Sequence, residues 1–290
     1  MSANMQKRIL ALNDISCFGK CSLTVALPII SSTGLECTIL PNCVLSTHTA
    51  IEGFTLRDLT GEIPPIVDHW KRLGIRFDGI YTGFMCNKEQ IDIAAHVIDT
   101  LRGEGTFVVV DPAMADNGKL YPIFDDTFPG YMRELCSKAD IIKPNITEAC
   151  MMLGKEYVPG PYTKDWVEGL LKELSSVGAK NIILTGVHFD DKKIGAASYN
   201  CSTGKTEYHL RDTVPGYYHG TGDVFCSAVV GAIGCGRTLS EATDMAVDLT
   251  ADSIRRTYEA GTDVRFGVNF EDGLSAYAAR VRGETLTRSK

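Results

Sequence analysis

Short apolar runs alternate with segments of helical period along most of this chain, and this alternation limits its fold more than any other feature. The runs that resemble buried strands are 8–13, 37–45, 79–83, 107–112, 139–145 and 181–186. The segments of helical period lie between them, at 21–33, 64–73, 88–101, around Tyr131 and at 163–176. Strands that alternate with helices predict a parallel or mostly parallel sheet that helices cover on both faces, which is an α/β fold.

The pattern changes beyond the last of these strands. The segments 194–201 and 206–212 resemble two antiparallel strands, and three helices are predicted at about 222–234, 239–258 and 270–281. No internal repeat, low-complexity segment or linker rich in Pro and Ser divides the sequence. We therefore predict that residues 1–290 form a single domain, with no separate lid domain.

The composition excludes several classes of partner. Hydrophobic residues make up 44% of the chain and charged residues 22%, as in ordinary globular proteins. A net charge of −7 and a pI near 5.4, without a cluster of Lys and Arg, argue against binding to nucleic acid. The first residues contain too short an apolar run for a signal peptide, and no run of eighteen uncharged apolar residues occurs. We therefore expect a cytoplasmic protein without a membrane partner.

Polar residues and glycines follow most of the predicted strands. They are Asn13, Asp14, Thr82, Gly83, Asp111, Asn145, Thr185 and Gly186. Each of them alone can be explained as a residue that ends a strand and caps the next helix. The ligand site of such a sheet is expected at the carboxyl ends of its strands, so the gathering of these residues at one edge favours a binding site there.

The stretch HGTGDVF places Gly220, Thr221, Gly222 and Asp223 at the start of a predicted helix. Backbone N–H groups at a glycine-rich helix start, together with the positive end of the helix dipole, form a hole that binds anions. The same dipole stabilises Asp223 as a carboxylate, which could accept a proton from a substrate hydroxyl while the hole holds a transferring phosphoryl group. A capped helix alone would explain the aspartate, but it explains the two glycines poorly.

Other nucleotide-binding and hydrolytic motifs do not fit this sequence. NDISCFGKCS follows the first strand as a P-loop would, but Asp14 stands at the first glycine position and Cys21 at the Ser/Thr position. No GxGxxG follows the first strand, and neither HExxH nor GxSxG occurs. The ten cysteines contain no CxxC pair and no Cys/His quartet with zinc spacing, so we expect reduced thiols.

Several motifs, in one order along nearly the whole chain, resemble those of the ribokinase-like kinases, and within them the vitamin kinases that act on pyridoxal or hydroxymethylpyrimidine. HGTGDVF is similar to the anion-hole and catalytic-base motif of that family, VVVDPAM to its strand that ends in DP, and ADIIKPNITEA to its segment ADI-x-x-PN-x-x-EA. STHTAIEG, IYTGF and IILTG match further pieces that are typical of pyridoxal kinases. The resemblance implies a three-layer ribokinase-like fold.

The resemblance also implies a reaction, which is ATP-dependent phosphorylation of the 5′-hydroxymethyl group of a B6 vitamer: pyridoxal, pyridoxamine or pyridoxine. Asp223 would be the general base, and the backbone of Gly220, Thr221 and Gly222 would form the anion hole. Other residues would bind the nucleotide or the metal. Asn145, Thr185 and Thr221 would face the phosphates, Tyr218 would lie near the adenine, and Asp111 and Glu148 would help to hold Mg²⁺, directly or through water.

The substrate ring would lie near Asp14, Ser16, Thr49 and Phe84, at the ends of the first strands. Many pyridoxal kinases carry a serine after the first strand; here the sequence is LNDIS, so either Asp14 or Ser16 could take that role. Phe84 replaces a common tyrosine and keeps the stacking face without the hydroxyl. The family commonly forms dimers, so a homodimer is implied as well.

Lys143 stands before PN, where many relatives carry threonine. Relatives with threonine often bind a monovalent cation close to the positions of Asp111 and Thr185, where positive charge helps to hold the nucleotide phosphates. The ammonium group of Lys143 could replace that cation, because it is compact and carries one charge as K⁺ does. The alternative is that Lys143 points to solvent or pairs with a nearby carboxylate.

Two other functions are compatible with parts of this pattern. The first is hydroxymethylpyrimidine kinase of thiamine synthesis, although STHT and TGF favour a pyridoxal-type substrate. The second is a noncatalytic small-molecule binder, which predicts loss of acidic positions, yet Asp223, Asp111 and Glu148 are all present. A sugar kinase is disfavoured because no long segment for a lid occurs in the first hundred residues.

Overall fold

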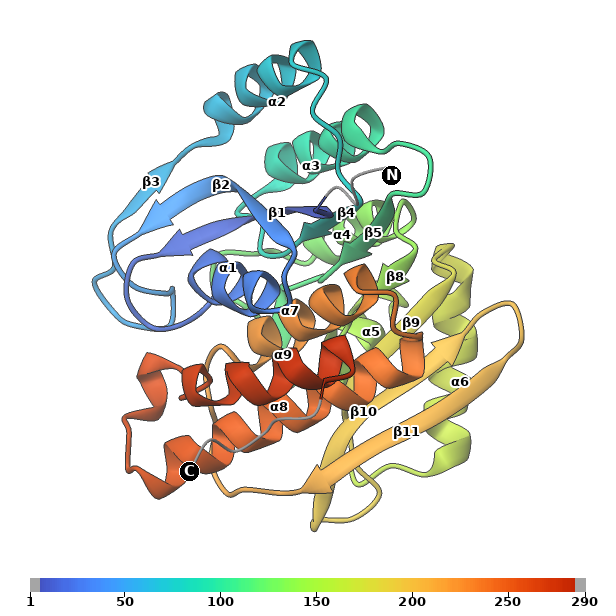
Figure 1. Cartoon of the computed structure of the whole chain (residues 1–290). Helices are drawn as coiled ribbons and strands as arrows, with labels where there is room; N and C mark the ends of the chain where they lie inside the picture. Colours follow the sequence, from blue (N-terminus) through green and yellow to red (C-terminus); the bar gives the residue numbers. More distant parts are fainter. Residues whose placement is uncertain (1–5, 285–290) are drawn as a thin grey trace.

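A nine-stranded sheet forms the centre of the computed structural model, which describes residues 6–284 (Figure 1). Its strands are β1 (Arg8–Ser16), β2 (Glu36–Leu45), β3 (Leu56–Asp58), β4 (Gly79–Thr82), β5 (Phe107–Val110), β8 (Ile141–Ile142), β9 (Asn181–Val187), β10 (Lys193–Asn200) and β11 (Lys205–Asp212). Their order is β11-β10-β9-β8-β5-β4-β1-β2-β3. The pairs from β2 through β1, β4, β5 and β8 to β9 are parallel, whereas β3, β10 and β11 are antiparallel to their neighbours. The prediction of a mostly parallel sheet is confirmed.

Helices cover both faces of the sheet, so the fold has three layers. One face is covered by α2 (Ile63–Arg72), α3 (Lys88–Leu101), α4 (Phe128–Cys136), α5 (Ile146–Met152) and α6 (Lys164–Leu174). The other is covered by α1 (Leu23–Ser32), α7 (Thr221–Gly234), α8 (Leu239–Glu259) and α9 (Leu274–Arg282). Because successive side chains of a strand point to opposite faces, Leu10 and Leu12 of β1 pack into the first core while Ile9 and Ala11 pack into the second.

Helix α7 is buried on nearly all sides, which explains why its sequence is apolar and rich in small residues. It packs between α1 and α8 and contacts β4 at the centre of the sheet. At Gly231 an added Cβ would lie 2.7 Å from the Tyr277 hydroxyl of α9, so a small residue is needed there. This tight packing fixes the position of the first turn of α7 against the carboxyl edge of the sheet.

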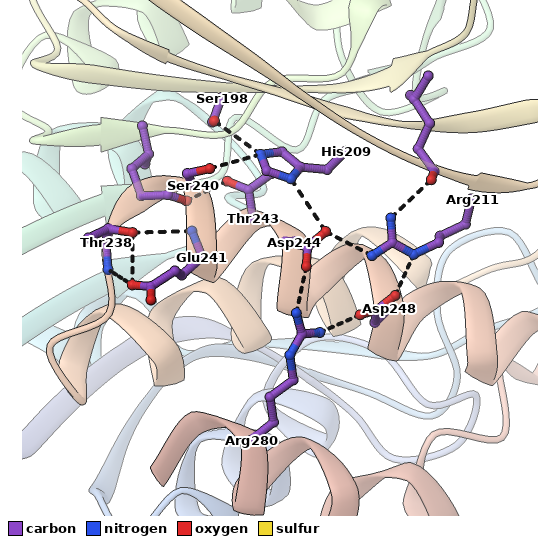
Figure 2. A network of polar contacts seen from close by, with 12 residues as sticks. Ser198, His209, Arg211, Thr238, Ser240, Glu241, Thr243, Asp244, Asp248 and Arg280 are labelled. Carbon is purple, nitrogen blue, oxygen red and sulfur yellow. Dashed lines mark hydrogen bonds and ion pairs between the residues drawn. The ribbon is translucent and has the colours of Figure 1, made fainter. Parts of the chain in front are cut away.

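Four charged side chains bind β11 to α8 and α9 at one side of the molecule (Figure 2). Arg211 of β11 contacts Asp244 at 2.7 Å and Asp248 at 2.5 Å, both on α8. Arg280 of α9 contacts the same two carboxylates. We call this group of Arg211, Arg280, Asp244 and Asp248 the α8 network.

Some elements differ from those that the sequence pattern predicts. β1 does not end at Asn13 but continues to Ser16 after a register shift between Asn13 and Ile15, so Asp14 and Ser16 belong to the strand. The short α5, the strand β3 and a hairpin of β6 (Ala115–Asp116) and β7 (Lys119–Leu120) were not expected, because two to seven residues are too few to show a period. The last predicted helix is a 3₁₀ turn at Glu271–Gly273 followed by α9.

Two further expectations concern the state of the cysteine thiols and the presence of membrane-spanning helices. All ten cysteines are free thiols. Within residues 6–284, no helix combines the length and apolar character that crossing a membrane requires.

Candidate functional site

The carboxyl ends of the central strands form a continuous edge, because backbone hydrogen bonds continue past the strands themselves. Asp111 N–H donates to Thr82 O at 2.9 Å, and Lys143 N–H donates to Val110 O at 3.0 Å. Thr185 N–H donates to Pro144 O at 3.0 Å. The predicted gathering of polar residues at this edge is therefore what the structure shows: the ends of β4, β5, β8 and β9 follow one another along it.

The first turn of α7 presents open backbone groups at this edge. Gly220 precedes the helix with a φ of 74°, and an added Cβ there would lie 2.3 Å from Lys20 O. Only glycine fits, both because of this contact and because other residues rarely adopt a positive φ. No side chain caps the helix, so its first N–H groups are free to bind an anion. An added Cβ at Gly222 would lie 3.5 Å from Lys143 Nζ, which places that ammonium group beside the same turn.

Lys143 forms a buried ion pair with Asp111. Nζ lies 2.8 Å from Oδ2, and about one-twentieth of each side chain is exposed, 5% and 4%. Burial lowers the pKa of Lys143, but the pKa is raised overall, chiefly by the negative charge of Asp111 and the hydrogen bond that Lys143 donates to it. Burial raises the pKa of Asp111 to about 6, although Lys143 works in the opposite direction. Oδ1 of Asp111 is buried and has no hydrogen-bond partner among the described residues, so this oxygen is free to receive a ligand.

Two further carboxyl groups belong to this region: Asp14 in the last part of β1 and Asp223 in the first turn of α7. Burial raises the pKa of Asp14 to about 6; Ser22 and Ser16 donate hydrogen bonds that lower it, whereas the charge of Asp223 raises it. Burial also raises the pKa of Asp223, against the Ser22 backbone and the charge of Lys143. A carboxyl whose pKa is raised toward neutrality is suited to accept a proton.

Asn145 and Glu148 form a capping box at the start of α5. Glu148 N–H donates to Asn145 Oδ1 at 2.9 Å, and Asn145 N–H donates to Glu148 Oε2 at 2.8 Å. Oε1 of Glu148 accepts a hydrogen bond from Met114 N–H at 3.1 Å. Burial, then the charge of Asp111, raises the pKa of Glu148 to about 8. Both Glu148 oxygens therefore already have backbone partners, which leaves contact through water as the simpler way for this group to reach a metal.

The residues predicted to surround a substrate ring lie around the ends of β1 and β4. Ser16 Oγ donates to Asp14 Oδ2 at 2.9 Å, and both side chains are buried. Phe84 follows β4 and packs against Phe124 at 5.8 Å between ring centroids. Thr49 lies on the loop between β2 and β3 and is half-buried. The structure thus brings three of the four residues together and places Thr49 on a neighbouring loop.

Two histidines and a tyrosine at this edge were not singled out from the sequence. His48, next to Thr49, stacks on His219 with ring centroids 4.8 Å apart, and its Nε2 lies 2.6 Å from Arg265 O. Tyr217 packs edge-on against His219 and donates its hydroxyl to Asp116 Oδ2 at 2.7 Å. The sequence motifs STHT and YYHGTGD contain these residues, but spacing alone does not reveal that two distant loops meet.

Tyr218 is buried, in contrast to its neighbour Tyr217, which is 52% exposed. The hydroxyl of Tyr218 donates to Pro215 O at 2.7 Å, and its ring packs into the core beneath α7 and α8. Contact of Tyr218 with an adenine stays a prediction.

Comparisons with known proteins agree on one family. Residues 72–267 match the family model described as phosphomethylpyrimidine kinase. A Bacteroides thetaiotaomicron protein provisionally named a phosphomethylpyrimidine kinase, crystallised with pyridoxal, is 37% identical with a TM-score of 0.89, over 94% of this chain and 96% of that one. The pyridoxal kinase of Lactobacillus plantarum is 30% identical with a TM-score of 0.86, over 97% of this chain and all of that one (100%). A Schizosaccharomyces pombe protein provisionally named a pyridoxal kinase is 23% identical over 295 residues, 95% of this chain and 92% of that protein.

Proposed function

Because this chain belongs to the phosphomethylpyrimidine kinase family, we propose that it transfers a phosphoryl group from ATP to the 5′-hydroxymethyl group of a B6 vitamer. The ribokinase-like α/β fold that it shares with the solved relatives agrees with the fold that its motifs imply. The observation that carries the proposal is the position of Asp223, in the uncapped first turn of α7 and beside the Lys143–Asp111 pair.

In this proposal Asp223 accepts the proton of the acceptor hydroxyl as the oxygen attacks phosphorus. The N–H groups of Gly220, Thr221 and Gly222 bind the oxygens of the transferring group, where negative charge is concentrated. Asn145 and Thr185 lie along the same edge and are proposed to face the phosphates; they come together as a bridge between neighbouring strands. The absence of a Cβ at Gly222 leaves space beside Lys143 Nζ, whereas Gly220 is required by its positive φ and by the closeness of Lys20 O.

The side chains that could bind a metal at this edge are few, which agrees with a magnesium ion that is held mainly by the nucleotide. Within residues 6–284, no cluster of three or more His, Cys, Asp or Glu side chains could hold a metal ion by itself. Mg²⁺ in kinases is usually bound by one or two carboxylates together with substrate phosphates and water. We propose that the unpartnered Oδ1 of Asp111, and Glu148 through water, supply the protein side of this set. The ion would neutralise charge on the phosphates.

We propose that Lys143 supplies the fixed positive charge that a free monovalent cation provides in many relatives. Its Nζ is held 2.8 Å from Asp111 and lies beside Gly222 in the anion hole. The expectation that Lys143 pairs with a nearby carboxylate also agrees with the structure, and the two roles are compatible. A buried ammonium group so placed attracts phosphate oxygens in a site with little water.

The acceptor is proposed to be a B6 vitamer because one relative at 37% identity was crystallised with pyridoxal, and another at 30% identity is a pyridoxal kinase. The second candidate is a hydroxymethylpyrimidine, which the description of the family favours. Phe84 would stack on the ring, and Asp14, Ser16 or Thr49 would contact its polar substituents. As the sequence resemblance implies, we also propose a homodimer, in the cytoplasm.

A panel of acceptors tests this proposal. ATP consumption would be measured in parallel with pyridoxal, pyridoxamine, pyridoxine, hydroxymethylpyrimidine and ribose. A B6 vitamer should give the highest kcat/KM, and Phe84→Ala should raise KM more than it lowers kcat, because stacking is made in both ground and transition states. A higher kcat/KM with hydroxymethylpyrimidine would replace the first candidate with the second, and no turnover with any acceptor would contradict both.

A further inference from the structure

Cys43 and Cys86 place two thiols in contact near the proposed ring site. Their Sγ atoms lie 3.5 Å apart, although the two residues are 43 positions apart in the sequence. Cys43 lies on β2 and is fully buried, whereas Cys86 is half-buried and lies on the segment 83–87 between β4 and α3. We call this segment the β4–α3 loop. It also carries Phe84, the proposed stacking residue.

Two buried side-chain amides hold the backbones of these cysteines side by side. Gln90 of α3 accepts a hydrogen bond from Cys86 N–H at 2.8 Å. Its Nε2 donates to Asn42 O, in the peptide bond before Cys43, at 3.2 Å. Asn42 Nδ2 donates to Phe84 O at 2.6 Å, and the side chains of Asn42 and Gln90 are fully buried. Because the two backbones are fixed in this way, the thiols stay within reach of each other.

The surroundings of the two sulfur atoms differ. Cys86 is partly open to solvent, so a small oxidant meets this thiol first. The hydrogen bond with Cys86, and then burial, raises the pKa of Cys43, so this group remains a protonated thiol in the reduced protein. An accessible cysteine in contact with a buried one is typical of a redox-sensitive cysteine and its resolving partner.

We infer that Cys43 and Cys86 form a reversible disulfide when the protein meets a low-molecular-weight disulfide, and that this bond displaces Phe84 and weakens binding of the acceptor ring. Only the effect on the ring rests on the proposed function. The Cys86 thiolate attacks one sulfur of the small disulfide and forms a mixed disulfide, which releases one small thiol. Cys43 then gives up its proton, attacks the Cys86 sulfur and expels the second small thiol. The protein pair is oxidised by two electrons, and the small disulfide is reduced to two thiols.

Formation of this bond requires movement, because the sulfur atoms must approach from 3.5 Å to about 2 Å. Cys43 is paired with Asp58 of β3 inside the sheet, so the movement falls mainly on Cys86 and the β4–α3 loop. Phe84 lies two residues before Cys86 on this short loop. A shift of the loop therefore moves the stacking ring away from the position that the hydrogen bonds to its backbone define.

Oxidised glutathione tests the disulfide directly, near pH 8, where free thiols are partly ionised. The treated protein would be digested without reduction and its peptides identified by mass. A peptide pair that joins Cys43 to Cys86 is expected, and dithiothreitol should separate it. Cys43→Ser should stop at the mixed disulfide on Cys86, and Cys86→Ser should carry neither product.

The matched control is Cys201→Ser, which removes another half-buried cysteine, just after β10 and far from β2 in the strand order. This variant should still give the joined peptide. Glutathione that stays on Cys86 in the wild type, or a Cys86 that remains unmodified, would overturn the inference.

The activity of the same samples tests the effect on the ring. In the oxidised wild type, KM for the preferred acceptor should rise by about threefold or more while KM for ATP changes little, and dithiothreitol should restore the first value. The oxidant should leave the kinetics of Cys86→Ser unchanged. A joined peptide with an unchanged acceptor KM would overturn the displacement of Phe84. A joined peptide in a protein that phosphorylates none of the acceptors would support the thiol pair and overturn the proposed reaction.

Discussion

The Lys143–Asp111 pair and the α8 network use the same chemical groups in opposite surroundings. About one-twentieth of each side chain of the pair is exposed, 5% and 4%, whereas the four side chains of the network are 29% to 42% exposed. In the pair, burial raises the pKa of Asp111 to about 6. In the network, burial acts against ionisation of Asp244, but hydrogen bonds from Arg211 and Arg280 outweigh it and the pKa falls to about 2.

The difference shows which charges stabilise the fold and which are held at a cost. Each carboxylate of the α8 network contacts two guanidinium groups and remains partly hydrated, so ionisation is favourable (Figure 2). At the candidate site, acids are buried near one another with one oxygen left without a partner, which is favourable only when ligands complete them. We expect substitution of a carboxyl group of the site by Asn to leave the free energy of unfolding at pH 8 unchanged or raised, and substitution in the α8 network to lower it while activity stays unchanged.

The largest effect on stability is expected for Lys143→Thr. It leaves the Asp111 carboxylate buried without its partner, so the free energy of unfolding at neutral pH should fall by about 3–5 kcal/mol. Lys180→Thr is the matched control, because Lys180 pairs with Asp140 at 2.7 Å while 74% of its side chain is exposed. The control should lose less than about 1 kcal/mol. Chemical denaturation of both variants measures the difference, and equal losses would mean that burial does not distinguish these ion pairs.

The same variant examines the proposed replacement of a monovalent cation. Wild-type activity should depend little on K⁺ compared with Na⁺ or a bulky organic cation at constant ionic strength. Lys143→Thr should be less active and should respond to K⁺. Strong activation of the wild type by K⁺, or a variant with unchanged kinetics in every salt, would remove this role.

A smaller effect, with a pH dependence, is expected for Asp14→Asn. The pKa of Asp14 is raised to about 6 by burial, so the folded protein binds this proton more tightly than the unfolded chain does. The stability contributed by the protonated group is present below about pH 4 and is lost as pH rises through about 6. The variant should therefore match the wild type near pH 4 and exceed it by about 1–3 kcal/mol at pH 8. Unfolding curves with a constant difference across that range would contradict the raised pKa.

The smallest effect is expected in the α8 network. Arg280→Gln removes one of the two guanidinium groups that contact Asp244 and Asp248, and should lower the free energy of unfolding by about 1 kcal/mol. Because the pKa of Asp244 is lowered, this contribution is present above about pH 4 and is lost as pH falls toward 2. High salt should reduce it. Kinase activity should stay at the wild-type value, and a large loss of activity would mean that the network is not separate from the site.

Much of the fold follows from the sequence because long elements carry their own period. Helices α3 and α8 are long amphipathic segments with polar N-caps, and the predicted ends lie within about a residue of those in the structure. α5 escaped the prediction at seven residues, although Asn145 and Glu148, spaced three apart, are the signature of a capping box. That signal is present in the sequence: Asn145 is a possible helix cap, but Glu148 is interpreted only as a ligand, so the two residues are not joined into a capping box.

The candidate site could be predicted only as a set of residues at one sheet edge. The glycines of GTGD predict an anion hole, but the sequence does not reveal the reasons for glycine at 220, which are its positive φ and the closeness of Lys20 O. Contacts between segments far apart in the chain, such as His48 on His219 or the Asn13 amide over Gly83, leave no periodic signal and depend on packing. The sequence leaves open whether Lys143 replaces a cation, points to solvent or pairs with a nearby carboxylate, and only the structure identifies Asp111 as its partner.

The most direct test of this account is a paired measurement on Asp223→Asn and Asp244→Asn, two substitutions of the same chemistry in the two regions. Turnover with saturating ATP and B6 vitamer and the free energy of unfolding at pH 8 would be measured for both. Asp223→Asn should lose about 10²–10⁴-fold in turnover, because a neutral amide cannot accept the proton, while its stability is unchanged or raised. Asp244→Asn should keep its turnover and lose stability. Near wild-type turnover in Asp223→Asn would contradict the account.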